Sequence, residues 1–153
     1  MKLTLKKAFR PVNFLGDKFS VKDENNNERF TAKGVSVKIG VYDTTGALVA
    51  TLKRGAGMLQ GKHYSIEIGG NEVCEISRKT KVVGMDVEIT GLPWVLEYGN
   101  ATFQHKLMCN DEVIMAITDK VAFLGESYDI EIFDAENELT CVAIALAIDY
   151  IKK

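Results

Sequence analysis

The C-terminal segment, residues 139–153, constrains the fold of this chain more than any other part of it. Residues 141–148 are all apolar, and Ala143, Ala145 and Ala147 lie among them. Alanine is the strongest helix former. Acidic residues precede the segment and two lysines follow it, which is the charge order that a helix dipole favours. Asp134 or Asn137 is placed to act as the N-cap.

An α-helix that is apolar on every side must be surrounded by protein, so the segment predicts a buried C-terminal helix. The alternatives are a surface helix with one wet face and a buried strand.

Before this segment, one local pattern recurs along the chain: an alternating strand, a polar turn and a second alternating strand. Each unit has the Gly, Asn or Asp turn that is typical of a β-hairpin, and the units cover residues 19–32, 37–52, 64–76 and 103–117. Further strands are expected at residues 3–9, 85–90, 95–98 and 128–133. Together these make about a dozen short strands, at the spacing of an all-β barrel or sandwich.

A flat sheet with so many strands is unusual, and closing the sheet removes its exposed edges. We therefore predict a mainly β (α+β) fold with a single domain, residues 1–153. In this fold a closed antiparallel β-barrel of about twelve strands surrounds the central C-terminal α-helix. A helix of about 13 residues is about 20 Å long, which suits the bore of a barrel built from short strands.

Composition excludes several classes of protein. Hydrophobic residues make up 46% of the chain and charged residues 26%, as in ordinary globular proteins. The net charge of −2 lacks the basic excess of a nucleic-acid binder. The three cysteines, Cys74, Cys109 and Cys141, are an odd number without C-x-x-C spacing, which favours reduced thiols in a cytoplasmic protein. No signal peptide or membrane-spanning segment is expected.

Several stretches resemble the LURP-one-related family, in order along the chain: residues 17–25, Tyr42-Asp43 with Gly46, residues 64–70 and residues 143–149. This family has the fold of the tubby C-terminal domain. The resemblance therefore implies a twelve-stranded antiparallel barrel around a hydrophobic helix. Tubby proteins bind phosphoinositide head groups, and phospholipid scramblases are thought to share the fold. The resemblance thus implies that anionic lipid is a possible partner.

Recognisable catalytic chemistry is missing from the sequence. His63 and His105 have no nucleophile context around them, and no His/Cys spacing suggests zinc. Residues 23–34 match a calcium loop at its first, third and fifth positions only, so a hairpin turn is expected there. The glycines of residues 55–61 lack the helix that a phosphate loop requires, and a connecting loop is expected. We predict no catalytic, cofactor or metal site.

The basic residues at predicted strand ends carry one functional hypothesis. If they gather on one rim of the barrel, they can hold an anionic head group; they are Lys53, Arg54, Arg78, Lys79 and Lys81. The leading hypothesis is a non-enzymatic binding module whose rim contacts an anionic membrane lipid or a protein partner. One alternative is a carrier of a small apolar ligand, which needs an open lumen. Another is an enzyme that uses carboxylates or His105.

Overall fold

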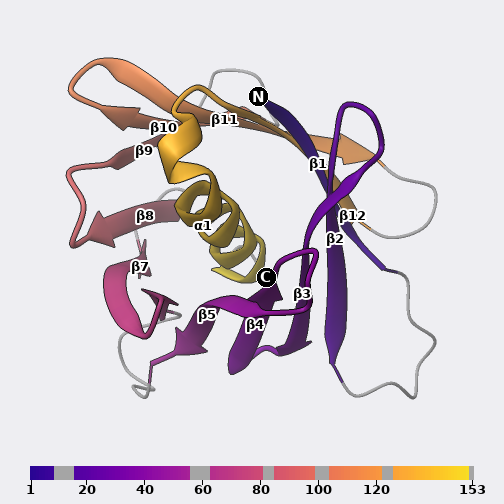
Figure 1. Ribbon diagram of the computed structural model, residues 1–153. Coiled ribbons are helices and arrows are strands. Elements are labelled where there is room, and N and C mark those ends of the chain that lie inside the picture. The colour runs from indigo at the N-terminus through magenta and orange to yellow at the C-terminus, as the bar shows by residue number, and fades with distance from the viewer. Residues whose placement is uncertain (9–15, 56–62, 81–84, 99–103, 122–125, 152–153) are drawn as a thin grey trace.

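A computed structural model describes residues 1–8, 16–55, 63–80, 85–98, 104–121 and 126–151. One antiparallel sheet of 12 strands curls around a single long helix (Figure 1). The strands are β1 (Lys2–Lys7), β2 (Asp17–Asp23), β3 (Glu28–Val35), β4 (Lys38–Tyr42), β5 (Leu48–Arg54), β6 (His63–Ile68), β7 (Asn71–Thr80), β8 (Met85–Thr90), β9 (Val95–Tyr98), β10 (Gln104–Cys109), β11 (Glu112–Val121) and β12 (Glu126–Ile132). A short 3-10 turn (Ala135–Asn137) leads into the helix α1 (Glu138–Ile151).

The hairpin turns follow from side chains that bind the backbone. The Asp23 carboxylate accepts hydrogen bonds from the amides of Asn25 and Asn27, both at 2.9 Å, and Asn26 takes a left-handed conformation with φ 64°. The Asp43 carboxylate does the same in the turn between β4 and β5. Asx turns of this kind are a standard way to reverse a chain. The segment that partly matches a calcium loop therefore begins with a hairpin turn, as predicted. The carboxylate at its first position, Asp23, accepts hydrogen bonds from backbone amides.

The sheet closes through its first and last strands. β1 pairs with β2 on one side and with β12 on the other, so it joins the meander β1–β8 to the meander β9–β12. The two remaining edges, β8 and β9, face each other, and no ladder joins them in the described strands. The barrel is thus nearly closed. This confirms the predicted twelve-stranded antiparallel barrel, with one seam between β8 and β9.

The predicted buried helix is also confirmed. Every residue of α1 from Thr140 to Ile151 is buried, and the helix lies inside the curled sheet (Figure 1). The inward-facing residues of the strands, such as Phe19, Leu52 and Ile76, form one core with it. The alternatives of a half-exposed helix and a buried strand are therefore wrong. The alanines of α1 let the surrounding strands approach closely.

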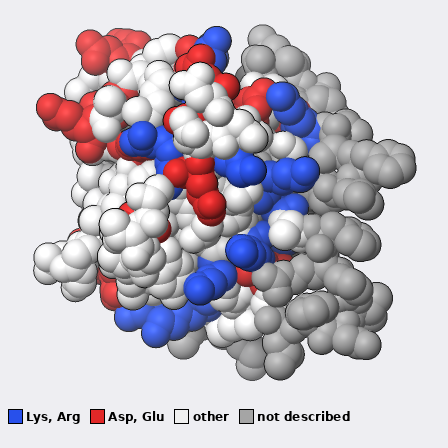
Figure 2. All heavy atoms as spheres, turned by 45° about the vertical axis from the view of Figure 1, so that its right-hand side comes forward, with Lys and Arg blue, Asp and Glu red and all other residues white. Residues whose placement is uncertain are grey.

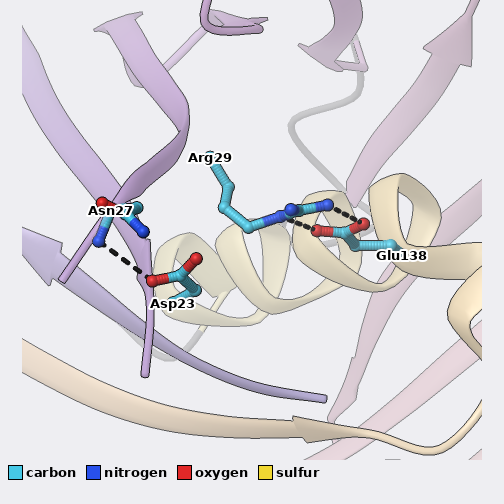
Figure 3. A network of polar contacts seen from close by, with 4 residues as sticks. All are labelled: Asp23, Asn27, Arg29 and Glu138. Carbon is cyan, nitrogen blue, oxygen red and sulfur yellow. Dashed lines mark hydrogen bonds and ion pairs between the residues drawn. The ribbon is translucent and has the colours of Figure 1, made fainter. Parts of the chain in front are cut away.

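Polar contacts hold α1 at both of its ends. Arg29 on β3 binds Glu138 in the first turn of the helix, and Asp23 binds its own turn close by (Figure 3). At the other end, the Tyr128 hydroxyl donates to the buried Asp149 carboxylate. Such contacts compensate for placing polar groups in an apolar core, and they fix how far α1 enters the barrel.

The two ends of the barrel differ in their connections. The hairpin turns after β2, β4, β6 and β10 all lie at the end where α1 begins. The opposite end is where α1 finishes, and the turn between β3 and β4 lies there. The connections outside the described residues, such as 9–15 and 56–62, also join strand ends on this side. This second end carries most of the basic residues discussed next.

Candidate functional site

Charge is distributed unequally between the two ends of the barrel. At the end where α1 finishes, basic side chains predominate: Lys6, Lys7, Lys18, Lys33, Lys38, Lys53, Arg54, Arg78 and Lys120. We call this set the basic end; Asp17 and Asp119 are the acidic side chains described there. The end with the tight turns has Lys2, Lys22 and Arg29 but is mainly acidic, with Asp23, Glu24, Glu28, Asp43, Glu72, Asp111, Glu112, Asp134, Glu136 and Glu138. Figure 2 shows a band of blue beside the grey atoms and the largest red group at the upper left.

The structure brings part of the predicted rim together. Lys53 and Arg54 end β5, and Arg78 lies near the end of β7, which runs in the same direction two strands away. Side chains alternate along a strand, so Arg54 and Arg78 share the parity of the inward-facing residues and border the mouth of the barrel. Lys79 lies on β7, but its side chain is outside the described part of the structure, and Lys81 is outside the described residues altogether.

Sequence reasoning missed Lys18, Lys33 and Lys38 on the neighbouring strands. Lys18 on β2 pairs with Lys33 on β3, and Lys38 on β4 pairs with Lys53 on β5. All four side chains are exposed. Each lies beside a buried residue in an alternating strand, which signals an outward position. The pairing register that brings them together is a tertiary property, and one sequence did not reveal it.

Among the described residues, Lys7, Lys53 and Lys120 form ion pairs, and the other six cations of the basic end do not. Lys53 Nζ lies 3.2 Å from Glu67 Oε1, and Lys33 Nζ lies 4.8 Å from the centre of the Tyr42 ring. Within the part of the chain that the structure describes, no ion pair involves Lys18, Lys38 or Arg54. The basic end therefore carries positive charge that the described acidic side chains do not neutralise.

An exposed apolar turn lies in the middle of this positive surface. Val35 and Val37 belong to the turn between β3 and β4 and are 45% and 57% exposed. Two hydrogen bonds fix the turn to the barrel. The hydroxyl of the buried Tyr64 donates to the Ser36 carbonyl at 2.7 Å. The Arg54 amide donates to the Val37 carbonyl at 2.9 Å. Apolar side chains on a fixed turn, surrounded by lysines, are typical of a surface that meets a partner.

A separate groove of about 600 Å³ lies on the side of the barrel, over β1, β12, β11 and β10. Its floor consists of small outward-facing side chains, Thr4, Ala116 and Thr118, and its borders include Lys2, Lys106 and Phe133. The groove is hollow because short side chains on adjacent strands stand between long ones. Its lining residues do not include any of the basic end.

The histidines and two of the cysteines are buried or partly buried, and their surroundings are as follows. His105 faces inward and is 8% exposed, and His63 Nε2 lies 3.9 Å from Glu75 Oε1. Burial raises the pKa of Cys74 to about 11 and that of Cys141 to about 12, so these thiols stay protonated at neutral pH. No group of three or more His, Cys, Asp or Glu side chains could hold a metal among the residues described. Most of the glycine stretch 55–61 lies outside that description.

A nearly closed antiparallel barrel around one apolar helix, with a basic end, defines a class of small β-barrel proteins. The chain belongs to the LURP-one-related family, which it matches over residues 1–149. This confirms the resemblance seen in the sequence. The chain is 27% identical over 139 residues to the uncharacterized protein YxjI of Bacillus subtilis, a match that covers 88% of this chain and 85% of YxjI.

The fold has also been seen in a solved structure. An X-ray structure of an Arabidopsis thaliana protein matches with a TM-score of 0.63, covering 99% of this chain and 92% of that chain. At 15% sequence identity, this likeness shows the fold alone. Among the described residues, α1 is too short and no other helix is long or apolar enough to span a membrane.

Proposed function

We propose that this protein is a non-enzymatic binding module whose basic end docks on an anionic membrane surface. The observation that carries the proposal is the exposed turn of Val35 and Val37 flanked by Lys33 and Lys38. Peripheral membrane proteins combine these two elements, because lysines are attracted to anionic lipid and apolar side chains enter the interface.

The expected strength of binding follows from the number of exposed lysines on this face. Each basic residue close to an anionic membrane contributes about 1 kcal/mol. Lys18, Lys33, Lys38 and Lys53 lie on one outer face of β2–β5. Their sum gives moderate attraction that weakens as salt is added, because exposed charges are screened over a Debye length. The two valines add apolar burial at about 25 cal/mol per Å².

The filled interior weighs against the carrier alternative. α1 occupies the centre of the barrel and is buried from Thr140 to Ile151. A small apolar ligand in the bore would have to replace this helix. The membrane proposal needs no such change, because its residues are already at the surface.

Sedimentation with vesicles tests the proposal. The protein should sediment with vesicles of phosphatidylcholine and phosphatidylserine at low salt, remain in solution with pure phosphatidylcholine, and be released by added salt. The triple variant Lys18→Glu/Lys33→Glu/Lys38→Glu should lose binding. The matched control is Lys22→Glu, which lies towards the acidic end of β2.

Two results would overturn the proposal: no sedimentation with anionic vesicles, or equal sedimentation of the triple variant and the wild type. Lys79→Glu and Lys81→Glu extend the test to the predicted rim residues whose side chains are not described. If the rim includes them, each variant should weaken binding.

A further inference from the structure

One row of side chains on the outer surface alternates in charge across five strands. Lys2 on β1 pairs with Glu131 on β12, which pairs with Ala116 on β11. Ala116 pairs with Lys106 on β10, and Lys106 pairs with Glu97 on β9. Directly paired residues on one face of a sheet lie side by side. Perpendicular to the strands, the row therefore reads basic, acidic, alanine, basic, acidic.

This order is self-complementary about Ala116. When the row is reversed and laid on itself, Lys2 meets Glu97 and Glu131 meets Lys106, so each position faces the opposite charge. A two-fold axis that runs along β11 in the plane of contact produces this arrangement. Closed dimers have such isologous interfaces, in which one surface meets its own copy.

The four charged residues are available for such contacts. Lys2, Lys106 and Glu97 are exposed, and Glu131 is partly exposed. None of them forms an ion pair within the portion of the chain that the structure describes. By contrast, their neighbour Asp129 is already bound by Lys120 at 2.7 Å and by Thr4.

A second row beside the charged one is apolar. Met108 pairs with Val113 on one side and with Val95 on the other, and the Phe133 amide donates to the neighbouring Ile114 carbonyl. Phe133 and Val95 are 57% and 61% exposed. The same two-fold axis brings Phe133 towards Met108 of the second copy and places Val113 against Val113. Large exposed apolar side chains in one row are typical of an interface.

We propose that the outer face of β9–β12 and β1 binds a second copy of this chain, with β11 against β11. The small side chains of Ala116 and Thr118 lie on the axis and allow the two sheets to approach. Face-to-face sheets pack about 10 Å apart, a separation that lysine and glutamate side chains bridge from opposite sides. This inference does not depend on the proposed membrane function.

The symmetry also fixes the orientation of the two copies. Because the axis lies along β11, both copies of this strand run in the same direction. The basic ends of the two copies then face the same side of the dimer. If the membrane proposal holds, the dimer presents two basic ends to one surface, and two linked sites bind more tightly than one.

Charge reversal tests the dimer by sedimentation velocity over a range of protein concentrations. Wild-type protein should dimerise reversibly. Lys106→Glu and Glu131→Lys should each raise the dissociation constant by about a hundredfold, because each change creates two like-charge contacts per dimer. The double variant Lys106→Glu/Glu131→Lys restores opposite charges and should dimerise as the wild type does. An equimolar mixture of the single variants should form a heterodimer.

Lys33→Glu is the matched control, because it reverses an exposed lysine on the basic end and should leave the dimer intact. Thermal melting of each variant shows whether it is folded; these positions are on the surface, and no loss of fold is expected. A wild-type protein that stays monomeric at high concentration overturns the proposal. So does a dimer that the single reversals leave unchanged or that the double variant does not restore. Loss of vesicle binding by the triple variant, with the dimer unchanged, would separate the two proposals.

Discussion

Arg29 on β3 holds Glu138 in the first turn of α1 through two parallel hydrogen bonds. Arg29 Nε donates to Glu138 Oε1 at 2.7 Å, and a terminal guanidinium nitrogen donates to Oε2 at 2.8 Å. The side chains are 39% and 13% exposed, so the glutamate is the more buried partner. The hydrogen bond and the charge of Glu138 raise the pKa of Arg29 above its ordinary value. This pair connects the start of the helix to the barrel wall (Figure 3).

Replacing Arg29 should therefore destabilise the protein although it lies near the surface. Arg29→Met leaves the Glu138 carboxylate without its bidentate partner, and we expect a loss of about 1–3 kcal/mol in the free energy of unfolding. Urea denaturation measures the loss. Arg54→Met is the control, since Arg54 has no such partner among the described residues, and it should change stability by less than about 0.5 kcal/mol. Equal effects of the two changes would contradict this role for the pair.

The tight fit of α1 gives a second prediction. Ala147 and Ile144 are both fully buried. Ala147→Leu should overpack the bore and cost about 1–3 kcal/mol, and Ile144→Ala should open a cavity and cost about 2–5 kcal/mol. Leu48→Ala, at a residue that is 58% exposed, provides the control and should be nearly neutral. Chemical denaturation measures all three. If Ala147→Leu stabilised the protein, the bore would be underfilled at that point.

Glycine is required at one position close to the basic end. Gly34 has φ 153°, and a Cβ added there would meet the carbonyl oxygen of Lys38 and the Cα of Ile39. Gly34→Ala should therefore displace the turn that carries Val35 and Val37, as well as lower the melting temperature. Gly46 has φ 84° with nothing within 4 Å of an added Cβ. Gly46→Ala should thus lower the melting temperature less, through backbone strain of about 1 kcal/mol.

Stability should fall at alkaline pH. Burial raises the pKa of Cys74 to about 11 and of Cys141 to about 12, above the ordinary thiol value. Burial also raises the pKa of Tyr64 and Tyr150. The folded protein thus binds more protons than the unfolded chain in this range. The stability that these extra bound protons contribute is fully present below the ordinary thiol pKa. It is lost as pH rises through the pKa values of the folded protein.

The pH prediction is checked by measuring the free energy of unfolding as a function of pH. Cys74→Ala/Cys141→Ala should make the alkaline loss less steep, although the substitutions also lower stability at neutral pH. The tyrosines should leave a residual slope. An unchanged slope in the double variant would show that thiol ionisation does not contribute.

The fold could be predicted because its strongest signals are local. The alternation of strands and the Asp23 and Asp43 turns depend on nearby residues, and the apolar run at 141–148 left no wet face for a helix. The seam between β8 and β9 was not predicted. It depends on the curvature of the whole sheet and on where β1 meets β12, which no local pattern encodes.

The surface was harder to predict for the same reason. Lys53 and Arg54 were found because they end a strand, but Lys18 and Lys33 became part of the basic end only through pairing register. Likewise, the row from Lys2 to Glu97 joins the consecutive strands β9–β12 to β1, which lies about ninety residues earlier in the chain than β9. Charge patterns across a sheet need the order of its strands, which one sequence leaves open.

The order in which the barrel is assembled matters during synthesis. β1 emerges from the ribosome before the other strands, but one of its two neighbours, β12, is the last strand to emerge, and α1 follows all of them. The inward faces of β1–β8 therefore have no core to pack against while most of the chain is being made. The hydrophobic centre can be completed only after all twelve strands have emerged, so the nascent chain should depend on shielding by chaperones more than a protein whose helices emerge early.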